Sequence, residues 1–125
     1  MLKQLKLWGP VLIWAGLIFF FSNIPDLESG LKEDFILRKI AHIFEYFILT
    51  LFLFRAFKGS LAMNLDRLYI YPAALALLYA ISDEFHQFFV DGRYCSLNDV
   101  MIDSIGIVVF YAMLIFMKGK TCSIK

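Results

Sequence analysis

The stretch LWGPVLIWAGLIFFFSNIP, residues 7–25, contains no charged side chain and decides the class of fold. An α-helix rises about 1.5 Å per residue, so a helix of this length crosses roughly 30 Å, the thickness of a bilayer's hydrocarbon core. The whole chain has the same character, because 61% of its 125 residues are hydrophobic and only 18% are charged. Soluble domains contain about 45–50% apolar and about 25% charged residues. The sequence therefore predicts an integral membrane protein.

Three further apolar runs follow, and ionisable residues shorten each of them. Residues 68–82 and 104–117 carry no charge, and the run from Lys39 to Phe57 is interrupted by His42, Glu45 and Arg55. Turn-forming residues separate the runs. We expect an all-α fold, a single domain over residues 1–125, built as a bundle of four transmembrane helices. The expected helices are 7–23, 37–56, 68–89 and 97–117.

The distribution of basic residues predicts the orientation. Four spans put both termini on one side of the membrane, and eight of the twelve Lys and Arg residues fall on that side: Lys3, Lys6, Arg55, Lys58, Arg67, Lys118, Lys120 and Lys125. Because Lys and Arg collect in short cytoplasmic loops, we expect cytoplasmic termini. The net charge of +1, without a basic cluster, argues against a nucleic-acid partner. In the first outer loop, Leu27, Leu31 and Phe35 recur every four positions and predict a short interfacial helix.

Ionisable residues gather at the outer end of this predicted bundle. Alternating helix directions bring seven of them to one face of the membrane: His42, Glu45, Asp83, Glu84, His86, Asp99 and Asp103. Helical spacing places Arg38, His42 and Glu45 on one stripe, and Asp83, His86 and Gln87 on another. A charged side chain facing hydrocarbon costs about 2.5–3.5 kcal/mol, so the stripes should face each other. The pattern predicts an outward-facing polar cleft that holds a ligand or catalyses a reaction.

A purely structural interpretation of these charges also stands. Pairs such as Arg38 with Glu45, or Arg93 with Asp99, could lock the helices together in a membrane, where polar contacts drive association. Gly106, in the middle of the fourth helix, is most simply explained by a close helix contact.

Two segments resemble a known family. Residues 38–47, RKIAHIFEYF, are similar to the first signature of VanZ-like membrane proteins, and residues 82–89, SDEFHQFF, to the start of the second. The second signature continues through Gly92-Arg93, Ser96, Asp99 and residues 103–106. The chain departs from the family pattern at Asp91, where Pro is usual, and at Phe110, where a small residue often stands. The resemblance covers about residues 10–115.

The resemblance implies a small multi-pass protein of the bacterial plasma membrane. It also implies a link to low-level resistance against the glycopeptide teicoplanin, which is the phenotype of the family's named member. The resemblance does not indicate which reaction, if any, the protein catalyses.

Three functions are compatible with the sequence. In the first, the cleft binds or masks a membrane lipid, either an anionic one or a polyprenyl-linked cell-wall precursor, with basic residues holding its phosphate or pyrophosphate. The expected ligand-binding residues are Arg38, Lys39, His42, Glu45, Tyr46, Asp83, Glu84, Gln87, Arg93, Asp99 and Asp103. In the second, the protein is a hydrolase or transferase acting on a lipid phosphate or glycolipid, with a divalent metal or an acid and a base supplied by the site. Its candidate catalytic residues are His42, Glu45, Asp83, Glu84, His86, Asp99 and Asp103, although no established metal-binding spacing is present. In the third, it is an accessory subunit of an envelope complex.

Overall fold

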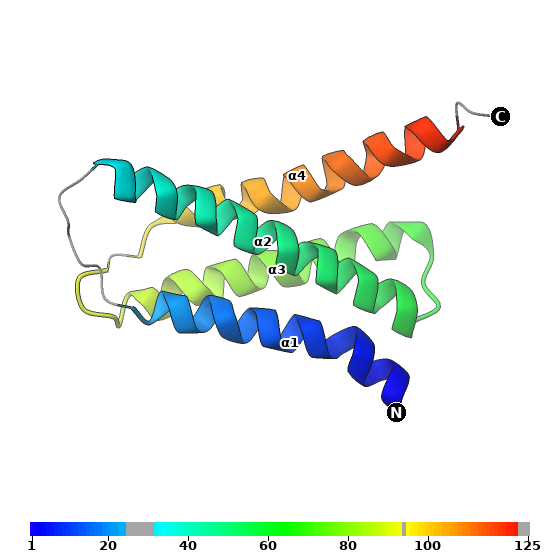
Figure 1. Cartoon of the computed structure of the whole chain (residues 1–125), viewed down its shortest axis with the longest axis horizontal. Coiled ribbons are helices and arrows are strands. Elements are labelled where there is room, and N and C mark those ends of the chain that lie inside the picture. The colour runs from blue at the N-terminus through cyan, green and yellow to red at the C-terminus, as the bar shows by residue number, and fades with distance from the viewer. Residues whose placement is uncertain (25–31, 94, 123–125) are drawn as a thin grey trace.

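Four α-helices make up the regular structure of the protein. The computed structural model describes residues 1–24, 32–93 and 95–122, and within them the helices are α1 (Leu2–Ser22), α2 (Lys32–Ser60), α3 (Leu65–Gln87) and α4 (Leu97–Cys122). The helices run along one long axis, and the N- and C-termini lie at the same end (Figure 1). The expectation of an all-α, four-helix fold is confirmed. The predicted interfacial helix is not tested as a whole, since Leu27 and Leu31 lie outside the described residues, whereas Phe35 belongs to α2.

The helices are mostly longer than the apolar runs that revealed them. α1 begins at Leu2 and α2 ends at Ser60, because Lys is a good helix former and extends a helix past the apolar boundary. α3 begins after Asn64, whose side-chain oxygen accepts a hydrogen bond from the backbone nitrogen of Arg67 at 3.1 Å. It ends at Gln87, two residues before the expected end, where the chain tightens into a turn.

Three of the helices are long and apolar enough to cross a membrane: Leu2–Ser22, Ile36–Ser60 and Leu97–Gly119. Large apolar side chains on them face outward, as shown by Leu12, Phe20 and Phe116, each at least 63% exposed. Such a surface suits lipid rather than water. α3 is of similar length, but charged residues lie near both of its ends.

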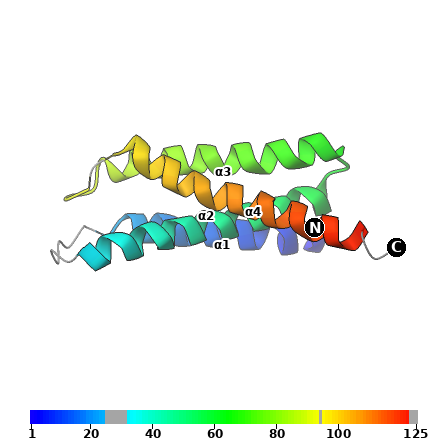
Figure 2. The same cartoon turned by 90° about the horizontal axis from the view of Figure 1, so that it is seen from above.

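The second helix is the hub of the bundle. α2 packs against α1, α3 and α4, whereas α1 and α4 do not touch within the described part of the chain. Figure 2 shows α3 on the side away from α1 and α2, with α4 crossing obliquely from the level of α3 toward that of α2. The centre of the core is formed by Tyr46, Leu49 and Leu53 of α2, each at most 2% exposed.

Gly106 permits the close approach of α4 to α2. A Cβ atom placed on Gly106 would lie 2.8 Å from the backbone nitrogen of Phe47 and closer still to the carbonyl oxygen of Ile43. Only a residue without a side chain fits this crossing. The contact lies about one helical turn from Asp103. It therefore also sets the distance between α2 and α4 where their polar residues lie.

Candidate functional site

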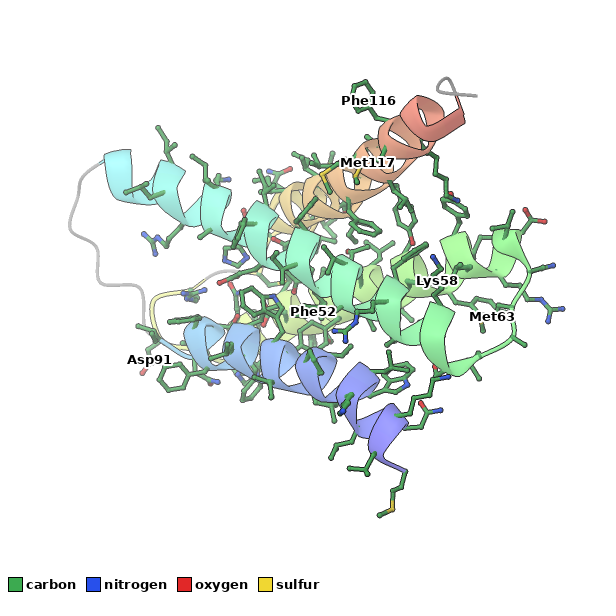
Figure 3. All side chains as sticks on the ribbon, turned by 45° about the vertical axis from the view of Figure 1, so that its right-hand side comes forward. Phe52, Lys58, Met63, Asp91, Phe116 and Met117 are labelled. Atoms are coloured by element: carbon green, nitrogen blue, oxygen red, sulfur yellow. The ribbon has the colours of Figure 1, made fainter. Side chains whose placement is uncertain are left out.

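A polar cavity of about 220 Å³ lies at one end of the bundle, where α2, α3 and α4 meet the turn between α3 and α4. In Figure 3 the labelled Asp91 marks this end, and Lys58 and Met63 mark the other. We call it the head cavity. Its lining residues are Arg38, Lys39, His42, Glu84, Gln87, Gly92, Arg93, Ser96, Asp99, Ile102 and Asp103.

The wall between α2 and α4 contains two pairs of ionisable side chains. Lys39 Nζ lies 3.3 Å from Asp99 Oδ1, and these two side chains are about one third exposed. One turn deeper, His42 Nδ1 lies 3.1 Å from Asp103 Oδ1, and the Asp103 side chain is 1% exposed. The pairs follow from the close crossing at Gly106, which holds the two helices near enough for short side chains to meet.

The wall on the α3 side holds a buried carboxylate and an arginine. Glu84 is 2% exposed, and its Oε2 accepts a hydrogen bond from the backbone nitrogen of Ser96 at 3.3 Å. Gly92 adopts a φ of 78°, a conformation that favours glycine, and so turns the chain toward Arg93. Arg93 donates from Nε to the carbonyl oxygen of Ile24 at 3.2 Å and from Nη2 to that of Phe21 at 3.5 Å.

Several buried polar atoms around the cavity have no hydrogen-bond partner among the described residues. They are His42 Nδ1, Glu84 Oε1 and both carboxylate oxygens of Asp103. The His42–Asp103 pair is within ion-pair distance but outside the geometry of a hydrogen bond. Buried polar groups are normally satisfied, and three of these atoms are carboxylate oxygens, so they mark a place where a hydrogen-bond donor or a transferred proton would be stabilised.

Two residues expected at the site connect α1 to α3 instead. Asp83 Oδ2 accepts hydrogen bonds from Ser22 Oγ at 2.8 Å and from Gln87 Nε2 at 3.1 Å. His86 lies 2.9 Å from Asn23 Oδ1 and stacks on the Phe19 ring, with centroids 4.5 Å apart. Consecutive residues differ by about 100° around a helix, and that rotation turns His86 toward α1 while Gln87 lines the cavity.

Glu45 and Tyr46 also lie outside the lining of the head cavity. Glu45 lines a separate, apolar pocket between α1 and α2 of about 180 Å³. Tyr46 is fully buried in the core, where its ring lies 6.5 Å from that of Tyr79. The predicted pairing of Arg93 with Asp99 is not formed, since Arg93 bonds to the end of α1.

Sequence reasoning missed the contribution of α1. Ser22 is 3% exposed and donates to Asp83, and Asn23 contacts His86. Both residues fall at the end of the expected helix 7–23, and neither was counted among the candidate site residues. The signal that could have found them is their place at the end of the first helix, which alternating helix directions bring beside the end of α3.

The described residues contain no group of three or more His, Cys, Asp or Glu side chains arranged to hold a metal ion. The divalent metal that the enzymatic alternative allowed therefore has no such group of ligands in this part of the chain.

Comparison with known proteins identifies relatives. The profile of the VanZ/LLP1 family matches residues 7–118. The uncharacterized membrane protein YwnJ of Bacillus subtilis (strain 168) is 32% identical over 110 residues, which cover 82% of this chain and 71% of YwnJ. No solved structure matches the chain. The resemblance noted in the sequence is confirmed.

Proposed function

The chain belongs to the VanZ/LLP1 family of membrane proteins, and we propose that its head cavity binds the phosphate or pyrophosphate group of an anionic membrane lipid. The lipid class that fits is a bacterial plasma-membrane lipid such as a polyprenyl-linked envelope precursor.

The observation that carries the proposal is the state of Arg93. Arg93 lines the cavity, and its hydrogen-bond acceptors are carbonyl oxygens, which are neutral and do not compensate its positive charge. Lys39 and Arg38 line the same cavity, and the carboxylate of Asp99 is already within ion-pair distance of Lys39. Arginine binds phosphate through charge-assisted hydrogen bonds, and Nη1 of Arg93 is not used in its two bonds to carbonyl oxygens.

The volume of the cavity limits the size of the group that can bind in it. Pockets for drug-sized molecules measure about 300–1,000 Å³, and the head cavity measures about 220 Å³. A phosphate or pyrophosphate fits such a space, whereas an attached glycan would extend outside it. Arg38 is two residues, or about 3 Å along the helix, from the start of the apolar span at Ile36, which is the depth of lipid head groups.

The proposal includes four membrane spans and cytoplasmic termini. α3 has 23 residues, about 34 Å of helix, and lies beside two helices that are apolar enough to cross. The termini share the basic end of the bundle, and the head cavity then faces outward.

Lipid binding by the full chain in nanodiscs tests the proposal. We expect isoprenyl phosphates and phosphatidic acid to be retained in preference to phosphatidylcholine, because only the former present an exposed phosphate. Arg93→Ala should weaken retention about tenfold, the loss of one charge-assisted pair. Arg67→Ala is the matched control, since Arg67 is exposed at the opposite end of α3. Equal loss in both variants would show non-specific attraction and would reject the proposal.

Resistance is the cellular consequence we propose. A precursor whose head group is held in the cavity is less accessible to teicoplanin. Expression of the wild-type chain in a susceptible host should raise the inhibitory concentration of teicoplanin, and expression of the Arg93→Ala variant should not.

The His42–Asp103 pair favours a second candidate, a lipid phosphohydrolase. A carboxylate 3.1 Å from the imidazole can orient it as a general base, and the buried Glu84 stands in the same cavity. Release of inorganic phosphate from a lipid phosphate by the wild type, and its loss in His42→Gln, would support this candidate. A wild type that binds the lipid without turnover would reject it.

A further inference from the structure

A second hollow lies between α3 and α4, two of the helices that line the head cavity. It measures about 540 Å³ and is almost entirely apolar. We call it the α3–α4 groove. Its lining residues are Tyr69, Ile70, Ala73, Ala74, Leu77, Ser104, Ile107, Val108 and Tyr111.

The groove has no exposed polar group that would attract a polar ligand to its middle. The hydroxyl of Ser104 donates to the carbonyl oxygen of Val100 at 2.7 Å, within its own helix. The remaining lining of the middle is aliphatic, and Ala73 and Ala74 leave the space that larger side chains would fill. The occupant must therefore be apolar over this length.

The groove continues toward the head cavity. On α4, Ser104 of the groove directly follows Asp103 of the cavity. On α3, Leu77, Ile81 and Glu84 recur at i, i+4 and i+7, one side of the helix. Ile81, between the two hollows, is 48% exposed, so the seam between α3 and α4 is not covered at that point.

The far end of the groove is closed by tyrosines. Tyr111 donates its hydroxyl hydrogen to the carbonyl oxygen of Tyr69 at 2.7 Å. Lys118 Nζ donates to the hydroxyl of Tyr69 at 2.7 Å and lies 5.0 Å from the centre of its ring. The groove thus ends at the hydrogen bond by which Tyr111 links α4 to α3.

The depth of the groove decides the length of the occupant. Leu77 is ten residues from the cavity end of α3 at Gln87, about 15 Å along the helix, which is half of a hydrocarbon core of about 30 Å. From Leu77 the groove runs a further eight residues, about 12 Å, to Tyr69. On α4, Ser104 is seven residues, about 10 Å, from Leu97, so the groove begins just before the midplane and extends into the leaflet opposite the head cavity, whichever way the protein is inserted.

We propose that the α3–α4 groove holds the chain of the lipid whose phosphate occupies the head cavity, and that this chain is a long isoprenoid. The inference rests on the proposed function, because it assumes a phosphate in the head cavity. An ordinary acyl chain ends near the midplane and reaches only the near end of the groove, at Ser104 and Leu77. A chain that follows the seam from the phosphate to Tyr69 crosses the midplane and fills it.

A comparison of two isoprenyl phosphates distinguishes the contribution of the lipid chain to binding from that of the phosphate. Undecaprenyl phosphate and farnesyl phosphate share the phosphate and the isoprene chemistry and differ in chain length. Native mass spectrometry of the full chain, released from detergent, reads each lipid adduct and the oligomeric state together. We expect the wild type to retain undecaprenyl phosphate about tenfold better, because an apolar chain in a groove gains many contacts that are individually small.

Adjacent leucines provide matched variants. Leu77→Trp fills the groove and should reduce the preference for the long chain to about twofold or less, without changing retention of farnesyl phosphate. Leu78→Trp adds the same ring to an exposed position that does not line the groove, and should keep the preference. Val108→Trp repeats the test from the α4 side if Leu77→Trp does not fold.

Each other outcome rejects the inference. Equal retention of both phosphates by the wild type, or equal loss of the preference in both tryptophan variants on α3, overturns the chain groove and leaves the proposed function standing. A dimer that Leu77→Trp dissociates shows that a second copy covers the groove. Failure to retain either phosphate overturns the proposed function and this inference with it.

Discussion

Replacing Gly106 with alanine tests the α2–α4 crossing. The added Cβ would lie 2.8 Å from the backbone nitrogen of Phe47, and ordinary contacts begin near 3.4 Å, so the helices must separate by at least the difference, about 0.6 Å. The obstructing atoms belong to the backbone and cannot rotate away. Overpacking costs about 1–3 kcal/mol, and alanine returns about 1 kcal/mol of helix propensity. We take the upper part of the range, and the expected net loss is about 2 kcal/mol.

Thermal unfolding of the detergent-solubilised protein measures this loss. For a chain of this size it corresponds to a fall in Tm of roughly 5–10 °C. Gly119→Ala is the matched control, because Gly119 lies on the same helix and its Cβ would meet no atom within 4 Å. An unchanged Tm for Gly106→Ala, or an equal fall in both variants, would refute the reasoning. Separation of the helices also lengthens the His42–Asp103 distance, so retention of lipid phosphates should fall in Gly106→Ala alone.

Three further predictions concern the polar end. Ser22→Ala removes the 2.8 Å hydrogen bond to the buried Asp83 and should lower the unfolding free energy by about 1–3 kcal/mol while lipid retention persists; parallel loss of retention in the folded variant would place Asp83 in the site. A double-mutant cycle of Lys39→Ala and Asp99→Ala should give a coupling of about 0.2–1 kcal/mol in unfolding, since both side chains are partly exposed, and a coupling above 2 kcal/mol would contradict that environment. In a Cys122→Ser background, a membrane-impermeant maleimide should label the exposed Cys95 on intact cells, and labelling only after lysis would reverse the orientation.

The sequence predicted the end of the bundle at which the polar residues gather, because alternating helix directions follow from counting apolar runs. It could not predict which way each side chain faces. Asp83, Glu84 and His86 lie within four residues, yet only Glu84 of the three lines the head cavity. Consecutive residues differ by about 100° around the helix, so which of them faces the cavity depends on how α3 is rotated when it packs against its neighbours.

Helix ends were predicted less well than helix number. The expected start at residue 68 of the third helix followed from the end of a charged stretch, whereas Asn64 caps the helix and carries it through Asp66 and Arg67. Charge marks the membrane boundary, and capping marks the helix boundary. The crossing at Gly106 was expected from residue size alone, and the structure supplied its partners, Ile43 and Phe47.

The central position of α2 has a consequence for biosynthesis. Helices emerge from the ribosome in chain order, so α2 and α3 are complete before α4 exists. Until α4 is made, His42 lacks Asp103, and an intramembrane ionisable group without its partner is costly. The site is thus completed by the last helix to be made, and a chain truncated before residue 97 would present unpaired polar groups to the proteases that survey membrane proteins.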